Sequence, residues 1–119
     1  MTVNAVIDME HLGRYTGGDP ALNTEILRLF DAQASELVAK LRIILDARDT
    51  QSWKTVTHTL KGAARGVGAF AFADAAALCE KLGLADRSAA LDAIGKLTNQ
   101  AEAVQIFVKA GVKAGQAAS

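Results

Sequence analysis

Residues 53–72 read WKTVTHTLKGAARGVGAFAF. Apolar side chains recur every three or four positions as far as Val67, which is the spacing of one face of an α-helix. Gly66 and Gly68 then interrupt the pattern, and glycine accepts the left-handed conformation in which helices often end. A second helical pattern starts near Ala69. This stretch therefore predicts a hairpin of two consecutive helices.

A hydrophobic pattern of the same period continues on both sides of the hairpin. It predicts a short helix over residues 8–16 and a long helix over residues 20–47, for which Asp19 is a suitable N-cap. A further helix is expected from about Ser88. The sequence beyond Gly111 is small and polar, so we expect the tail to fray.

Length and composition favour a single all-α domain. The chain has 119 residues, half of them apolar and only one of them proline, so it can bury a core of its own. Four long amphipathic helices with short connections predict an antiparallel four-helix bundle, with the short first helix added at the N-terminus. One domain is expected over residues 1–119. Since no further apolar stripe is obvious, we expect a monomer.

Charge and cysteine content exclude several classes of function. The 13 basic and 13 acidic side chains cancel, which argues against a partner that is a nucleic acid or a membrane surface. One cysteine and two histidines are too few for an internal disulfide or a Cys/His zinc site. Neither a signal peptide nor an apolar run long enough to cross a membrane is apparent, so we expect a cytoplasmic location.

The residues around His58 indicate a candidate reactive site. On a helix, His58 lies about 200° around the axis from the nearest apolar side chains, which predicts an exposed imidazole. Its helical neighbours Lys54, Lys61 and Arg65 are all cationic. Such cations would stabilise a phosphoryl group attached to the ring. The alternative is that His58 and these charges simply form the solvated face of the helix.

Gly62 follows His58 by one helical turn. A glycine inside a helix costs roughly 0.5–1 kcal/mol relative to alanine. This cost is easier to explain if the backbone of a partner, or a phosphoryl group, must approach the helix at this point. The alternative is that Gly62 and Gly66 relieve crowding against a neighbouring helix.

Taken together, these residues form a pattern. H-x-L-K-G followed by G-A, within residues 58–69, resembles the signature of histidine-containing phosphotransfer (HPt) domains. The similarity continues in I-D…L…G-G-D over residues 7–19 and reaches about residue 87. The sequence departs from the family's C-x-x-L-E motif, because Ala76 aligns with the usual small residue or cysteine while Cys79 takes the apolar position.

The resemblance implies a phosphorelay intermediate. His58 would accept a phosphoryl group from a receiver-domain aspartate or a histidine kinase and pass it to the receiver domain of a response regulator. Lys61 would stabilise the phosphoryl group, and Gly62 would give the partner access. Such proteins have no ATP site or kinase activity of their own, and no nucleotide-binding glycine motif is present. We expect no cofactor on this chain and Mg²⁺ on the partner receiver.

The hairpin suggests which residue orients the histidine. Counting outward from the turn at Gly68 places His58 opposite Glu80, which could accept a hydrogen bond from Nδ1–H and leave Nε2 free. Glu80 is equally compatible with a solvated surface acid. Gln33, on the long second helix, is another candidate for the same role. The residues expected to contact the partner are Lys54, Thr55 and Arg65.

Two other functions stay open. The chain could be a helical adaptor that docks receiver or kinase domains without carrying phosphate, but such an adaptor has no need of His58, Lys61 and Gly62 together. It could also be an enzyme that uses His58 as a general acid–base. No second titratable group or pocket is inferred beside His58 from the helical pattern, which disfavours an enzyme.

The remaining notable residues favour structural interpretations. His11 has no charged neighbours that suggest chemistry, so we expect ordinary surface. Cys79 has the spacing of a core position and is expected to be an inert buried thiol. Trp53 is either part of the core or a partly exposed anchor beside the histidine.

Overall fold

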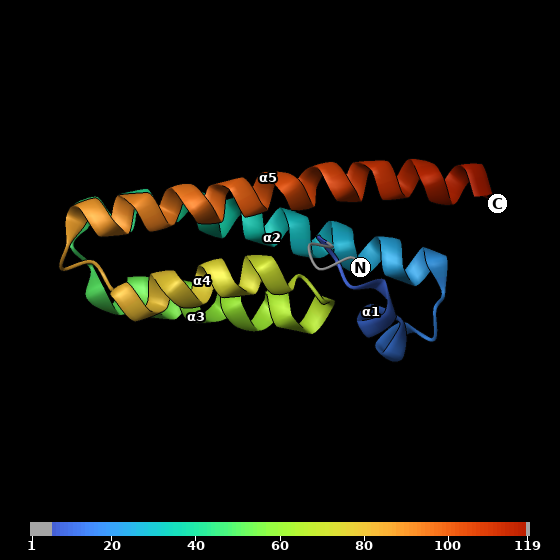
Figure 1. Cartoon of the computed structure of the whole chain (residues 1–119), viewed down its shortest axis with the longest axis horizontal. Coiled ribbons are helices and arrows are strands. Elements are labelled where there is room, and N and C mark those ends of the chain that lie inside the picture. The colour runs from blue at the N-terminus through green and yellow to red at the C-terminus, as the bar shows by residue number, and fades with distance from the viewer. Residues whose placement is uncertain (1–5, 119) are drawn as a thin grey trace.

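The computed structural model describes the backbone of residues 6–118 and the side chains of residues 6–111 (Figure 1). The helices are α1 (Met9–Thr16), α2 (Pro20–Ala47), α3 (Thr50–Val67), α4 (Phe70–Leu82) and α5 (Arg87–Ala118). No strand occurs among the described residues. The predicted all-α class, with a short extra helix at the N-terminus, is therefore confirmed.

Local sequence signals set the helix ends. The side chains of Asp8, Asp19 and Asp49 each accept a hydrogen bond from a backbone N–H in the first turn of the following helix. Gly17 and Gly68 end α1 and α3 in the left-handed conformation. Short polar caps and glycines therefore account for where α1, α2 and α3 begin and where α1 and α3 end.

The C-terminal helix is longer than the sequence suggested. The backbone of α5 stays helical past Gly111, from which we predicted a frayed tail, and continues to Ala118. The fraying itself stays a prediction. None of the described helices is long and apolar enough to span a lipid bilayer.

The helices α2, α3, α4 and α5 enclose a common core. α2 packs against α3 and α5, and α4 packs against the same two helices. α1 lies near the start of α2, where it contacts α2 and α3 (Figure 1). The largest fully buried side chains include Trp53, Phe72, Leu12, Leu41, Leu45, Leu60 and Leu97.

Several apolar side chains that share the predicted helical patterns are exposed. Tyr15 and Leu29 are mostly exposed, at 70% and 62%, and Leu22 and Leu82 are about two-fifths exposed. Leu29 follows the buried Leu27 by two positions, which is about 200° around a helix, so one of the two must face outward. The spacing identified the correct helices and overestimated the width of their buried faces.

Gly68 joins the hairpin to the start of α1. The backbone N–H of Asp8 donates to the carbonyl oxygen of Gly68 at 2.8 Å. Gly68 has a φ of +85°, and a Cβ atom at this position would lie 2.8 Å from the carbonyl oxygen of Asp8. Both the backbone conformation and the close approach therefore require glycine.

We expect Gly68→Ala to lower the free energy of unfolding by about 1–3 kcal/mol, because alanine is strained at this φ and its methyl group displaces Asp8. Chemical denaturation monitored by circular dichroism measures the effect. Gly66→Ala is the matched control, since Gly66 is helical and has open space around its Cα. Equal stabilities of the two variants would contradict this account.

Candidate functional site

His58 lies near the middle of α3, and its side chain is 70% exposed. Its Nδ1 atom is 3.0 Å from Oε2 of Glu80 on α4. An ionised carboxylate can only accept a hydrogen bond, so the neutral ring donates from Nδ1 and leaves the Nε2 lone pair free. The prediction that the hairpin places His58 opposite Glu80 is therefore confirmed.

Lys61 is part of the same cluster. Its Nζ atom is 2.5 Å from Oε1 of Glu80, so the two oxygens of one carboxylate serve Lys61 and His58. The side chains of Lys61 and Glu80 are only 20% and 21% exposed, in contrast to that of His58. Of the three cations that the sequence places around the histidine, Lys61 is thus ion-paired with Glu80, a partner that the sequence analysis did not predict.

The ion pair keeps Glu80 charged. The hydrogen bond from the Lys61 ammonium lowers the pKa of the Glu80 carboxyl; partial burial opposes this, and the His58 ring adds a smaller lowering effect. A lowered pKa means that the contribution of Glu80 to stability is fully present above the ordinary glutamate pKa. It is lost as the pH falls through the lowered value.

The surface of α3 beside His58 is open. Gly62 and Gly66 are exposed, and a Cβ atom added to either would meet nothing within 4 Å. The alternative that these glycines relieve crowding against a neighbouring helix is therefore wrong. The absence of side chains leaves the α3 backbone accessible one turn beyond the histidine.

Of the other predicted site residues, three lie on the same helix as His58 and one lies on α2. Lys54, Thr55 and Arg65 are exposed on the same helix as His58, and their contact with a partner stays a prediction. Gln33 is exposed on α2, and no hydrogen bond joins it to His58 in the described structure. The Nδ1 atom is hydrogen-bonded to Glu80, so Gln33 does not fill the orienting position.

A comparison with protein families gives the same assignment as this geometry. The family model described as the Hpt domain matches residues 25–106, which is more than half of the chain. The chain belongs to the Hpt domain family. No curated protein and no solved structure matches it.

Family membership carries a general function. Hpt domains carry out histidine phosphotransfer in two-component phosphorelays, interacting with receiver domains and kinases. They are phosphocarriers without kinase activity of their own. The match covers His58, Lys61, Gly62 and Glu80 and leaves α1 outside.

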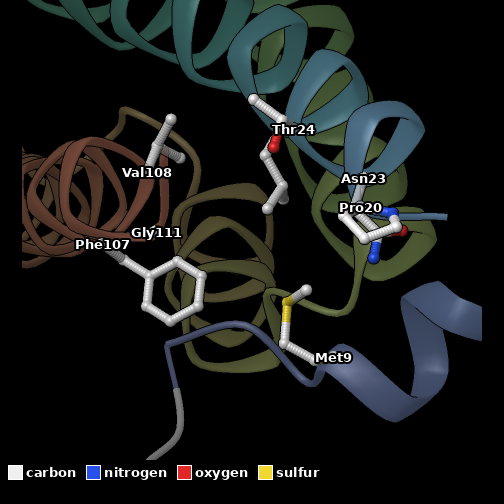
Figure 2. A pocket seen from close by; sticks show the side chains of 8 residues that line it. Met9, Pro20, Asn23, Thr24, Phe107, Val108 and Gly111 are labelled. Carbon is white, nitrogen blue, oxygen red and sulfur yellow. The ribbon is translucent and has the colours of Figure 1, made fainter. Parts of the chain in front are cut away.

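In this Hpt domain, the histidine lies on an open face and not in a cavity. A cavity of about 210 Å³ lies between α1, α2 and α5, and its lining includes Met9, Asn23, Thr24 and Phe107 (Figure 2). A second hollow lies between α2 and α5. His58 lines neither of them. The exposed position suits docking of another protein better than binding of a small substrate.

His11, which we expected at the ordinary surface, is half-buried. Its ring makes edge-to-face contacts with Tyr15 and Phe70, at centroid distances of 5.3 and 5.1 Å. Its Nε2 atom is buried without a hydrogen-bond partner. The sequence did not reveal this position because Phe70 comes from α4, which is distant in the chain.

Trp53 and Cys79 connect the two helices that carry the site. Trp53 is fully buried, and its indole N–H donates to the Cys79 carbonyl oxygen at 2.9 Å. Burial raises the pKa of the Cys79 thiol to about 11, so the thiol is protonated and unreactive at neutral pH. The predicted inert thiol is confirmed, and Trp53 is a core residue.

Proposed function

We propose that this Hpt domain is a phosphorelay intermediate with His58 as its phosphoryl acceptor. It takes the phosphoryl group from a receiver-domain aspartate, or from a kinase, and passes it to the receiver of a response regulator. The observation that carries the proposal is the exposed His58 ring with its Nδ1 atom 3.0 Å from Glu80. This contact favours the tautomer in which Nε2 is the nucleophile.

The transfer step needs little from the protein beyond position and charge. The Nε2 lone pair attacks phosphorus, the bond between phosphorus and the aspartate oxygen breaks, and the aspartate leaves as a carboxylate. The ring gains a positive charge, which the Glu80 carboxylate stabilises through the retained Nδ1–H hydrogen bond. Lys61 provides a cation for the phosphoryl oxygens. The reverse sequence returns the group to a receiver.

The chain itself binds no cofactor in this proposal. No cluster of three or more His, Cys, Asp or Glu side chains suited to hold a metal ion occurs among the described residues. The acidic residues of the receiver would hold the Mg²⁺ that neutralises charge on the phosphoryl group.

Partner docking would use the open side of α3. Lys54, Thr55 and Arg65 surround the histidine on this helix, and Gly62 allows the partner to approach closely. We further propose that α2–α5 act as an antiparallel four-helix platform in a cytoplasmic monomer. A monomer suffices because α3 and α4 of one copy supply His58 and Glu80.

The direct test is the intact mass of the protein after incubation with phosphorylated receiver domains. We expect a mass gain of one phosphoryl group that is lost on mild acid treatment, as phosphohistidine requires. Binding of receivers without any adduct would favour the non-phosphorylated adaptor instead.

We expect Gly62→Gln to separate stability from docking. Glutamine is a better helix former than glycine, so the free energy of unfolding should rise by about 0.5–1 kcal/mol. The new side chain fills the open space one turn from His58, so the rate of transfer from a receiver should fall by about tenfold or more. The rate is measured by quenching the reaction with a phosphoryl-labelled receiver at successive times and following transfer of the label.

Gly95→Gln is the matched control for this substitution. Gly95 is an exposed glycine on α5 with open space around it, so it tests the same gain in helix propensity away from His58. It should leave the transfer rate unchanged. Equal transfer rates for the two variants would show that Gly62 does not serve partner access.

A further inference from the structure

Glu80 contacts both residues to which the proposed function assigns a role at the phosphoryl group, His58 and Lys61. Its Oε1 atom is paired with Lys61 Nζ at 2.5 Å, and its Oε2 atom accepts from His58 Nδ1 at 3.0 Å. Lys61 follows His58 by three positions on α3, so the two side chains are neighbours on the helix surface. Lys61 therefore lies next to the histidine and is already paired before any phosphoryl group arrives.

Phosphorylation changes the charges of this cluster. Before transfer, the positive Lys61 and the negative Glu80 balance each other, and the form of the His58 ring that can attack is neutral, because its Nε2 lone pair must be free. Attack through Nε2 gives a positively charged ring and adds a dianionic phosphoryl group. If Lys61 stayed on Glu80, the phosphoryl group would have no cation from the cluster other than the ring that carries it, and Glu80 would be shared between two positive charges.

We propose that phosphorylation of His58 moves Lys61 from Glu80 to the phosphoryl group, while Glu80 keeps the His58 ring as its single cationic partner. No covalent bond other than the transferred phosphoryl linkage changes in this exchange. Before the exchange Lys61 and Glu80 form one ion pair. After it the ring is paired with Glu80, and Lys61 neutralises one of the two negative charges of the phosphoryl group. This inference rests on the proposed role of His58 as phosphoryl acceptor.

The structure favours Lys61 over the other nearby cations for this exchange. Lys61 is mostly buried by the hairpin and held beside Glu80, so little side-chain freedom is lost when it turns to the phosphoryl group. Lys54 and Arg65 are exposed, and neither makes an ion pair with Glu80 in the described structure. Glu80 thus acts as a positioning residue that keeps a lysine ready at the site.

The exchange can be followed by the ¹³C NMR signal of the Glu80 carboxyl group in wild type and Lys61→Met. Phosphoramidate serves as a direct chemical phosphoryl donor, so no partner protein is needed. Before phosphorylation, we expect the substitution to shift the Glu80 signal, because Lys61 is its ion-pair partner. After phosphorylation, the two proteins should give the same signal. A shift of equal size in both forms would show that Lys61 stays on Glu80 and would overturn the inference.

The lifetime of the phosphohistidine gives a second readout. Lys61→Met should shorten the half-life by about threefold, which is the effect of losing one partly exposed charge pair. Lys96→Met is the matched control, because Lys96 is a lysine that pairs with Asp92 on α5, outside the His58 cluster, and it should leave the half-life unchanged. Equal half-lives of all three proteins would overturn the inference.

Failure of the underlying function has a different signature. If phosphoramidate adds no phosphoryl group to wild type beyond that found for His58→Gln, the proposed acceptor is wrong and the exchange falls with it. If His58 is phosphorylated but Lys61→Met shifts the Glu80 signal as much as it does before phosphorylation, only the proposed exchange is wrong. The role of His58 as acceptor then stands.

Discussion

We expect His58→Gln to abolish phosphoryl acceptance and to leave the fold intact. Glutamine has no nucleophilic nitrogen, because the lone pair of an amide nitrogen is delocalised into its carbonyl group. The side chain of His58 is 70% exposed and contacts the rest of the structure through the hydrogen bond to Glu80. The free energy of unfolding should therefore change by less than about 0.5 kcal/mol. Intact mass after incubation with phosphorylated receivers, and thermal melting, check the two halves of this expectation.

The second histidine of the chain is the control for this experiment. His11 is half-buried against Tyr15 and Phe70, so His11→Gln should alter stability and leave phosphoryl acceptance in place. An acid-labile adduct on His58→Gln would assign the acceptor role to another residue. Loss of helicity in His58→Gln would show that the residue supports the fold.

Trp53→Ala should destabilise the domain more than any surface substitution. Trp53 is 1% exposed, and its removal leaves a large cavity between α3 and α4 as well as an unmade hydrogen bond to the Cys79 carbonyl oxygen. Truncation of a buried aromatic side chain costs about 3–5 kcal/mol. This is a large share of the roughly 5–15 kcal/mol that stabilises a typical domain. Thermal melting should show a decrease in Tm of about 10–20 °C.

Leu29→Ala provides the contrast, since Leu29 shares the helical apolar pattern of α2 and is 62% exposed in the structure. Its effect should stay within about 0.5 kcal/mol. The Trp53 hydrogen bond ends on the residue next to Glu80, so any folded Trp53→Ala protein should also lose alignment of Glu80 with His58. A Tm equal to that of Leu29→Ala would refute the central position of Trp53 in the core.

Much of the fold was readable from short-range patterns. Helix periodicity gave the positions of the helices, and aspartate caps and glycines marked many of their ends, because these signals depend on contacts within a few residues. The exposure of His58 and its position opposite Glu80 also followed from the sequence. Helix geometry sets the direction of each side chain, and a tight hairpin turn sets the register of two adjacent helices.

Only the tertiary structure decided how the charged side chains pair. The sequence predicted Lys61 as the cation for the phosphoryl group and gave no partner for it, but in the structure it is paired with Glu80. Gln33 was predicted as a second candidate to orient the His58 ring, but Glu80 occupies that position. A lysine side chain has several rotatable bonds, so its partner depends on which acid the neighbouring helix places within reach. Helix periodicity carries no information about that distance.

The tertiary structure also decided how much of each helix surface is buried. Tyr15, Leu22 and Leu29 are exposed although they share the apolar patterns, and His11 is half-buried although it does not. In this chain, the sequence determined which residues form helices and which helix face carries the histidine, because both depend on local backbone geometry. The packing of α1 to α5 decided how much of each face is covered and which charge meets which, because burial and ion pairing depend on neighbours that are distant in the sequence.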